Sequence, residues 1–286
     1  MTAAPAPGVR APEQASSDSP PAVTAAREAR VELMGMMLDP LSQGETVERI
    51  VSGASAGRGG VVVTANLDHL RRFQSPGRYR TIVETADLVV ADGAPLLWAS
   101  RVGGCPVPER VAGSDLVWSI SEASAKADVG VFMLGGDPGT AERAGEVLCE
   151  RYPGLRIAGA DCPPFGFEKD EAYVEGLKTK LRRSGAGVVF VALGSPKQEF
   201  VIDDLRSTLP SAWWLGIGIS FSFVCGDVQR APRALQVLGL EWVHRLAQEP
   251  QRLAKRYLVE GLPFAAGLFA HAMGRRVRGG RRRQSA

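Results

Sequence analysis

Several common signatures of function are missing from this chain of 286 residues. Its four cysteines lie far apart, with no Cys-x-x-Cys pair and no histidine at ligand spacing, so neither a zinc site nor a disulfide framework is indicated. No run reaches the ~20 apolar residues of a membrane span. The first thirty residues are rich in Ala, Pro and Ser but lack the apolar stretch of a signal peptide. We therefore expect residues 1–30 to be a disordered leader and the protein to work in a reduced, cytosolic setting.

Nucleotide-binding fingerprints with a fixed spacing are absent too. The first expected strand ends in Met37-Leu38-Asp39-Pro40 and not in Gly-x-Gly-x-x-Gly, which argues against an NAD-dependent oxidoreductase. The turn at Gly135-Gly136 is not a Walker loop, because no Gly-Lys-Ser/Thr follows it. The sequence therefore predicts no bound cofactor.

The composition is that of a soluble protein with a sizeable core. Apolar residues make up 45% and charged residues 23%, and the formal net charge of +3 is too small to indicate a partner. The charge is uneven, because nine basic residues follow position 250 against Glu260 alone: Arg252, Lys255, Arg256, Arg275, Arg276, Arg278, Arg281, Arg282 and Arg283. Residues 275–286 are expected to be a basic tail.

Short apolar runs alternate with helical stretches over residues 31–228, as in βαβ units. Strands are expected at 31–37, 61–63, 88–90, 129–134, 155–160, 188–193 and 213–217, and helices at 42–51, 94–101, 114–126 and 168–183. The first helix opens with a Ser-x-x-Glu capping box, Ser42 to Glu45. The pattern predicts an α/β catalytic core with a Rossmann-like, mostly parallel sheet and helices on both faces.

Polar side chains follow two of the expected strands. Thr64 and Asn66 end the first of these runs, and Asp92 ends the second. Ligands of open α/β sheets bind at the carboxyl ends of the strands, so we expect the three side chains to share one rim. Taken alone, the same residues also fit an Asp-Gly turn and a helix cap.

Two later strand ends carry groups suited to a nucleotide or a sugar. A turn at Gly135 and Gly136 can bring backbone N–H groups toward a phosphate, although ordinary strand-to-helix punctuation also explains it. Gln198 and Glu199 follow the 188–193 run. A glutamine can bind a ring edge or a sugar hydroxyl and a glutamate can accept from ribose hydroxyls, while a capped helix start is the alternative.

Residues 229–274 are expected to form a helical appendage. Aromatic and basic side chains interleave up to Tyr257, but Glu241 and Glu249 interrupt the basic patch and no nucleic-acid module is recognisable, so nucleic acid is not an expected partner. The apolar stretch over 257–273 is broken by an acid and a proline. It suits either a helix lying in a membrane interface, with the following arginines on anionic headgroups, or a plain C-terminal core helix.

Several separate blocks appear in order along the chain. They are Ala91-Asp92-Gly93, Glu109-Arg110-Val111-Ala112-Gly113-Ser114-Asp115-Leu116, Gly194-Ser195-Pro196-Lys197-Gln198-Glu199, Arg230-Ala231-Pro232, Leu240-Glu241-Trp242 through Arg245, and Glu249-Pro250 with Arg252. Together they resemble the WecG/TagA/CpsF glycosyltransferases, glycosyltransferase family 26, over roughly Val31 to Tyr257.

The resemblance implies an inverting transfer of a sugar, in the best-known members N-acetylmannosamine, from a UDP donor to a polyprenyl-diphosphate-linked acceptor in polysaccharide or wall-polymer synthesis. It implies a peripheral enzyme on the cytoplasmic face of the cell membrane. The alternative is a non-catalytic, membrane-associated protein that binds a sugar nucleotide or acts as a scaffold. The choice of UDP-sugar, the acceptor and the oligomeric state, a homo-oligomer included, are left open.

The resemblance also carries roles over to individual residues. Asp92, in its Ala-Asp-Gly context, matches the proposed catalytic base, and inversion needs one such carboxylate opposite the leaving group. The expected substrate-binding residues are Thr64, Asn66, Arg110, Gly135, Gly136, Gln198 and Glu199, and the expected lipid-diphosphate-binding residues are Arg245, Arg252 and Arg256.

Two features of the chain qualify these roles. Ser222 stands where the family commonly has an acid. The chain has no Asp-x-Asp motif of the kind that holds a divalent ion in many sugar-nucleotide transferases, so we expect no metal and a departing UDP stabilised by arginines and backbone N–H groups. His69 and His244 have no recognisable catalytic context and are not in the predicted catalytic set.

Overall fold

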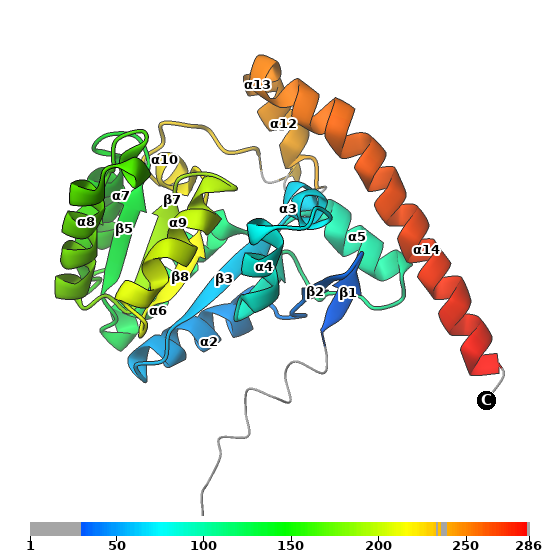
Figure 1. Ribbon diagram of the computed structural model, residues 1–286, viewed down its shortest axis with the longest axis horizontal. Coiled ribbons are helices and arrows are strands. Elements are labelled where there is room, and N and C mark those ends of the chain that lie inside the picture. Colours follow the sequence, from blue (N-terminus) through cyan, green and yellow to red (C-terminus); the bar gives the residue numbers. More distant parts are fainter. Residues whose placement is uncertain (1–29, 233, 236–238, 285–286) are drawn as a thin grey trace, which may run out of the picture.

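The computed structural model describes residues 30–232, 234–235 and 239–284 (Figure 1). The strands are β1 (Val31–Leu33), β2 (Met36–Leu38), β3 (Gly60–Ala65), β4 (Leu88–Ala91), β5 (Val131–Gly135), β6 (Ile157–Asp161), β7 (Val188–Ala192) and β8 (Trp213–Gly216). The core helices are α2 (Gln43–Ser55), α3 (Leu67–Phe73), α4 (Arg78–Thr85), α5 (Ala94–Val102), α6 (Gly113–Ala127), α7 (Thr140–Arg151), α8 (Glu171–Ser184), α9 (Lys197–Leu205) and α10 (Ser220–Val224), with short 3-10 turns at Phe167–Lys169 and Arg206–Thr208. The C-terminal helices are α12 (Glu241–Gln248), α13 (Pro250–Ala254), a π-helical segment (Lys255–Gly261) and α14 (Leu262–Gln284). The predicted leader, apart from Arg30, lies outside the described residues.

The central sheet, as far as the chain is described, has six strands in the order β4-β3-β8-β7-β5-β6, and every neighbouring pair is parallel. The chain passes from β3 outward to β4, while β8, β7, β5 and β6 lie on the other side of β3. Such a change of direction places a crevice outside the carboxyl ends of the two strands concerned, here β3 and β8. The predicted α/β fold with a mostly parallel sheet is confirmed.

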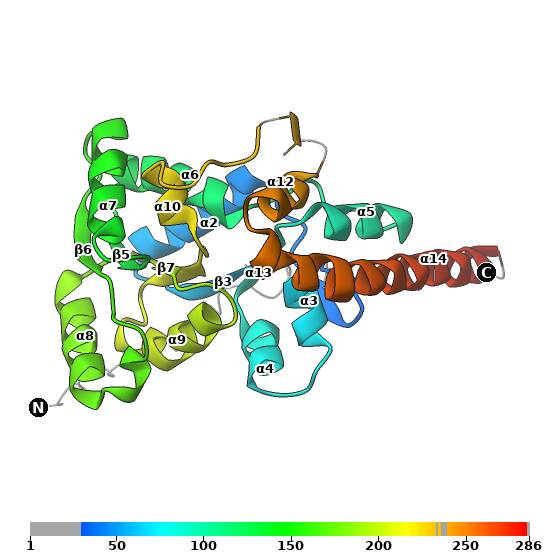
Figure 2. The same cartoon turned by 90° about the horizontal axis from the view of Figure 1, so that it is seen from above.

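Helices cover both faces of the sheet because successive side chains of each strand point to opposite faces. Val61 and Val63 of β3 pack in an apolar layer with helices α3, α4, α8 and α9, whereas Val62 packs in a second layer with α2, α6, α7 and α10. Figure 2 shows the two groups of helices on either side of the strands. Burial on both faces explains why the strand sequences are continuously apolar.

The first predicted strand is wrong in one respect. Residues 31–37 form part of a hairpin, in which β1 pairs with β2 in antiparallel fashion, and this hairpin is separate from the central sheet. The chain turns at Met34 and Gly35, whose φ angles of 48° and 85° are both left-handed. A glycine adopts that conformation at no steric cost, so Gly35 in the apolar run was the available signal for a turn.

The hairpin is tied to the outer edge of β4 through Asp39. The Asp39 N–H donates to the Val89 carbonyl, and the Val89 N–H donates to Asp39 Oδ2, both at 2.7 Å. Arg30 in turn donates from Nε to Asp39 Oδ1 at 2.6 Å. The backbone groups of Val89 are therefore already satisfied on the side where β4 has no neighbouring strand.

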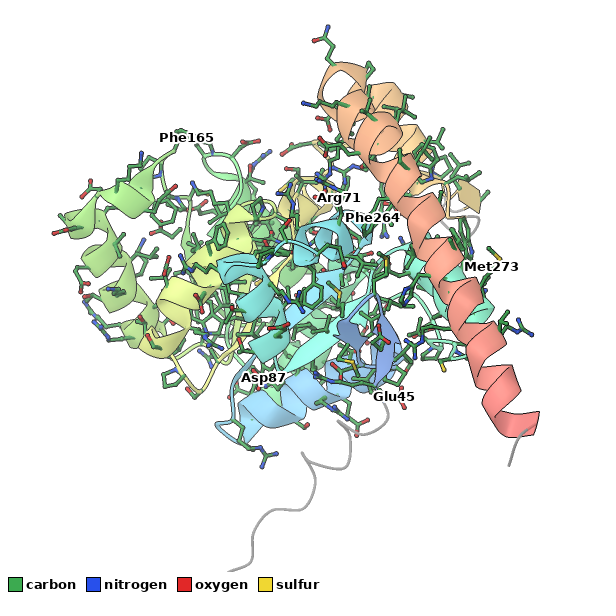
Figure 3. The ribbon with its side chains drawn as sticks, turned by 45° about the vertical axis from the view of Figure 1, so that its right-hand side comes forward. Glu45, Arg71, Asp87, Phe165, Phe264 and Met273 are labelled. Carbon is green, nitrogen blue, oxygen red and sulfur yellow. The ribbon has the colours of Figure 1, made fainter. Side chains whose placement is uncertain are left out.

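The C-terminal helices form an appendage that docks on the core and then extends from it (Figure 1). Leu268 and Ala272 of α14 are buried in the layer that includes α5. Arg71 of α3, labelled in Figure 3, pairs with Glu260 of the π-helical segment at 2.9 Å. Helix α14 continues to Gln284, so residues 275–284 of the predicted basic tail are helical. None of the helices in the described ranges is long and apolar enough to cross a membrane.

Candidate active site

The carboxyl ends of β3, β4 and β8 meet at Gly113, the first residue of α6. The Gly113 N–H donates to Asp92 Oδ2 at 3.4 Å. A Cβ atom at Gly113 would lie 3.3 Å from Thr64 Oγ1 and 3.5 Å from the Cα of Ile217. A side chain at this position would require Thr64 to shift by a few tenths of an ångström, so glycine suits the close approach of the helix start to the strand ends. Thr64 and Asp92 therefore share one rim, as predicted from the sequence.

Asn66 lies on the same rim. It is the N-cap of α3, and its Oδ1 accepts from the N–H groups of Asp68 at 3.0 Å and His69 at 3.2 Å. A Cβ atom at Gly93 would be 3.4 Å from Asn66 Cβ, so the cap stands beside the turn that carries Asp92. The helix-cap interpretation of Asn66 is thus correct, and a contact with substrate stays a prediction.

Asp92 is half-buried, and its burial and the charged groups near it determine the pKa of its carboxyl group. Burial of the carboxyl group raises the pKa of Asp92 to about 7, which the nearby Arg110 guanidinium opposes and the Glu241 carboxylate reinforces. A carboxyl group with a pKa near neutrality can both exist as a carboxylate and hold a proton that it has taken up. This is the behaviour expected of a general base.

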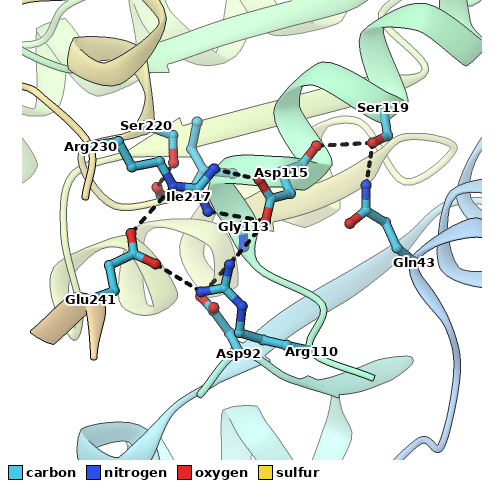
Figure 4. Close-up of polar contacts among 10 residues, drawn as sticks. All are labelled: Gln43, Asp92, Arg110, Gly113, Asp115, Ser119, Ile217, Ser220, Arg230 and Glu241. Carbon is cyan, nitrogen blue, oxygen red and sulfur yellow. Dashed lines mark hydrogen bonds and ion pairs between the residues drawn. The ribbon is translucent and has the colours of Figure 1, made fainter. Parts of the chain in front are cut away.

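Arg110 lies in an ion cluster with Asp115, Arg230 and Glu241, which joins residues 110–115 to residues 230–241 (Figure 4). Its Nη1 donates to Glu241 Oε2 at 2.9 Å and its Nη2 to Asp115 Oδ2 at 3.3 Å. Arg230 pairs with the same two acids, with Nη2 at 3.1 Å from Asp115 Oδ2 and Nε at 3.3 Å from Glu241 Oε1. Sequence reasoning assigned no role to Asp115, Arg230 or Glu241. Their presence in the ordered blocks of the chain was the available signal.

Gln198 and Glu199 at the start of α9 are 3% and 4% exposed, so their side chains are committed within the protein. Gln198 Oε1 accepts from the Gly218 N–H at 2.9 Å and its Nε2 donates to Glu199 Oε1 at 2.9 Å. His69 Nε2 lies 3.3 Å from the same Glu199 oxygen. Burial pushes the pKa of Glu199 upward, but these hydrogen bonds and the His69 charge more than offset it and leave the pKa below its usual range.

Sequence reasoning missed the contact between His69 and Glu199, because the two residues are far apart in the chain and neither has a local motif. The contact links α3, which Asn66 caps, to α9. A direct contact of Gln198 or Glu199 with substrate stays a prediction. In this structure both side chains instead hold neighbouring strand ends together.

The Gly135-Gly136 turn follows β5, which is separated from β3 by β7 and β8. Both residues have left-handed φ angles, 98° and 85°. A Cβ atom at Gly135 would lie 2.6 Å from the Ala192 carbonyl oxygen, and the Gly136 N–H donates to that oxygen at 2.8 Å. The Gly136 N–H is thus engaged by the sheet, and a contact of this turn with a phosphate stays a prediction.

The three arginines predicted to bind a lipid diphosphate have different surroundings. Arg256 Nη2 pairs with Asp68 Oδ2 at 2.9 Å and so anchors the appendage to α3. Burial raises the pKa of Asp68, but Arg256 and two arginines of α3 outweigh it and hold that pKa below its usual range. Arg245 has no ion pair with any described residue, and the Arg252 side chain lies outside the described part. Ser222 is half-buried in α10.

The fold and this rim define an α/β enzyme with the titratable carboxyl of Asp92 at the carboxyl edge of a parallel sheet. Within the described ranges, no group of three or more His, Cys, Asp or Glu residues is placed to hold a metal ion. Residues 31–278 match the model of the glycosyl transferase WecG/TagA/CpsF family, and the chain belongs to that family. It is therefore a glycosyltransferase of the hexosyl-transferring kind, and the resemblance noted in the sequence is confirmed.

A curated relative gives the comparison more detail. The chain is 34% identical over 196 residues to the N-acetylglucosaminyldiphosphoundecaprenol N-acetyl-beta-D-mannosaminyltransferase of Bacillus spizizenii, an alignment that covers 68% of this chain and 74% of the relative.

Proposed function

We propose that the protein transfers N-acetylmannosamine or a related hexose, with inversion, from a UDP-sugar to a polyprenyl-diphosphate-linked saccharide in the synthesis of a cell-surface polysaccharide or wall polymer. The name of the Bacillus relative supports both the donor sugar and the lipid-linked acceptor. The observation that carries the proposal is Asp92, a half-buried carboxyl with a pKa of about 7 that follows β4 at the carboxyl edge of the sheet and accepts from the Gly113 N–H.

Asp92 acts as the general base in this proposal. The acceptor hydroxyl attacks the anomeric carbon on the face opposite the leaving group, the bond to UDP breaks, and the proton of the hydroxyl passes to Asp92. The Gly113 N–H, which donates to Asp92 Oδ2, fixes the orientation of the carboxylate. Thr64 and Asn66, which flank it on β3 and α3, bind hydroxyls of the two sugars.

The charge that develops on the departing UDP is stabilised by guanidinium groups, among them Arg110, whose charge acts on Asp92. Gln198 and Glu199 are proposed to contact the substrate, and their hydrogen bonds also hold the Gly218 backbone and α3 in place. Arg245, Arg252 and Arg256 are proposed to bind the lipid diphosphate, with Arg256 exchanging its Asp68 partner for phosphate oxygens. We expect the reaction to proceed without a metal ion.

The appendage is proposed to bring the enzyme to the cytoplasmic face of the membrane as a peripheral protein. Exposed large apolar side chains are concentrated on it, namely Val243, Leu258, Val259, Leu262, Met273 and Val277. Met273 is seen on the outer side of α14 in Figure 3. Arginines follow along the same helix, a combination that suits an interface with anionic headgroups. The alternative of a C-terminal core helix also has support, since Leu268 and Ala272 pack in the core.

The test is release of UDP from a panel of UDP-sugars, with a short-chain polyprenyl-diphosphate N-acetylglucosamine acceptor, detergent and a chelator. The native chain is compared with Asp92→Asn and with Asp128→Asn, a matched change at a side chain that is 92% exposed. We expect acceptor-dependent release by the native chain and by Asp128→Asn, and a loss of at least a hundredfold in Asp92→Asn. Full turnover by Asp92→Asn would show that Asp92 is not the catalytic base. Binding of UDP-sugars without turnover of any of them would instead favour the non-catalytic alternative.

A further inference from the structure

The ion cluster of Arg110, Asp115, Arg230 and Glu241 connects the catalytic rim to the appendage. Arg110 and Asp115 belong to the core, Arg230 to the segment after α10, and Glu241 is the first residue of α12 (Figure 4). Each arginine contacts both acids, and each acid contacts both arginines. All four side chains are between 19% and 29% exposed, so the cluster remains within reach of a ligand.

The cluster lies next to the reacting group. Gly113, which donates to Asp92, is two residues from Asp115. Arg110 and Glu241 also act on the Asp92 carboxyl in opposite directions, the guanidinium favouring its charged form and the carboxylate its protonated form. A ligand that changes the pairing in the cluster therefore also changes the field at Asp92.

The four groups are balanced in charge, two guanidinium groups against two carboxylates. Guanidinium forks bind carboxylates and phosphates with the same donor geometry, so a diphosphate competes for the donors that the carboxylates now occupy. One turn after Glu241 on the same face of α12, Arg245 has no ion pair with any described residue. Arg245 is thus a further guanidinium group close to the cluster.

The two acids are not equally fixed. Asp115 stands in the first turn of α6, a helix with six buried residues. Glu241 stands at the start of α12, in which no residue is buried. The appendage is held elsewhere, by Leu268 and Ala272 in the core and by the Arg256–Asp68 ion pair. Glu241 can therefore leave the cluster while α14 stays docked.

We propose that Arg110 and Arg230 form a diphosphate-binding pair and that Glu241 is its built-in competitor, which a diphosphate displaces on binding and which releases α12 from the core as it leaves. The diphosphate is that of the nucleotide donor or that of the lipid-linked acceptor, an assignment that rests on the proposed function. The pairing chemistry itself requires only a diphosphate ester. Arg230 and Glu241 gain a role in ligand binding that neither had from the sequence.

The test measures the Kd of UDP, uridine and geranyl diphosphate by calorimetry on the full chain at one fixed ionic strength. The variants are Glu241→Gln, Arg230→Gln and the control Arg143→Gln, which removes a guanidinium from an exposed pair with Asp227. We expect Glu241→Gln to tighten binding of a diphosphate about fivefold or more and Arg230→Gln to weaken it about tenfold or more. Binding of uridine, which has no phosphate, should not change in any variant, and Arg143→Gln should behave as the native chain.

Hydrogen exchange of residues 241–248 provides the second readout. A diphosphate should accelerate exchange there in the native chain, and Glu241→Gln should exchange fast without any ligand. A folding defect would weaken binding and could therefore mimic the loss expected in Arg230→Gln. It could not produce the gain of affinity expected in Glu241→Gln, so the two variants together test the proposal. A response to UDP alone assigns the pair to the donor, and a response to geranyl diphosphate alone assigns it to the acceptor.

The proposal is overturned if Arg230→Gln leaves both diphosphate Kd values unchanged, if Glu241→Gln does not tighten either one, or if neither diphosphate binds. These outcomes are separate from the fate of the proposed function. If the native chain turns over a UDP-sugar but diphosphate binding does not depend on Arg230, the proposed function stands and the proposed diphosphate-binding pair is rejected. If diphosphate binding depends on Arg230 but no UDP-sugar is turned over, the pair stands and the proposed function is rejected.

Discussion

Replacing Asp92 by Asn should abolish turnover and yet stabilise the protein, by an amount that grows with pH. Folding raises the pKa of this carboxyl from 3.8 to about 7. The folded state therefore binds the proton more tightly than the unfolded state, and the stability contributed by the protonated group is lost as the pH rises from about 4 to 7. Between pH 5 and pH 8 this loss amounts to about 3 kcal/mol, at about 1.4 kcal/mol per tenfold change in the equilibrium. Asn is neutral throughout and loses nothing.

Thermal unfolding of the native chain and of Asp92→Asn at pH 5, 6, 7 and 8 measures this difference. For a chain of this size, about 3 kcal/mol corresponds to a melting-temperature gap that widens by roughly 6–12 °C in favour of the variant between pH 5 and pH 8. Asp128→Asn should show no such trend, because its side chain is exposed and asparagine readily adopts the left-handed conformation found there. A gap that stays constant with pH would refute the assignment of a raised pKa to Asp92. In the same buffers, kcat/KM of the native enzyme should rise through pH 7 and then level off.

Three further predictions concern the neighbours of Asp92 and the appendage. Gly113→Ala places a methyl group 3.3 Å from Thr64 Oγ1, so UDP release should fall at least tenfold, and full activity would show that the rim is not the reaction site. Glu199→Gln removes the buried carboxylate that faces His69 and accepts from Gln198. It should lower the free energy of unfolding by about 1–3 kcal/mol in urea titrations, whereas an unchanged midpoint would contradict the structural role. Asp68→Asn weakens the anchor of Arg256 and should speed tryptic cleavage of the appendage several-fold, with Asp128→Asn as the control whose equal sensitivity would refute the anchor.

The layered core could be predicted from the sequence because its signals are local. Val188–Ala192 is a continuous β-branched and apolar run, which is what a strand buried on both faces requires, and it forms β7. The Ser42–Glu45 capping box is present as predicted, with both of its reciprocal hydrogen bonds. The hairpin at residues 31–38 was missed because its two short strands have the same apolar character as one longer strand, and only Gly35 distinguishes them.

In the candidate site, too, the features with local signals could be predicted and the contacts between distant residues could not. The rim of Thr64, Asn66 and Asp92 could be predicted because Thr64 lies in the last two residues of β3 and Asn66 and Asp92 directly follow β3 and β4, and parallel strands end at one edge. The pairing of Arg110 with Glu241 spans 131 positions, and that of His69 with Glu199 spans 130. No periodicity or spacing relates residues so far apart. Their contacts follow only from the strand order and from the docking of the appendage.

The closure of β4 by Asp39 limits how copies of this protein can associate. A strand at the edge of a sheet normally presents unpaired N–H and C=O groups that recruit another chain, which is a common route to aggregates and to continuous intermolecular sheets. At β4 both groups of Val89 are taken by Asp39, itself held by Arg30. Growth of the sheet across two molecules is left to the opposite edge, β6. The Arg30–Asp39 pair thus protects one flank of the enzyme against self-assembly through its backbone.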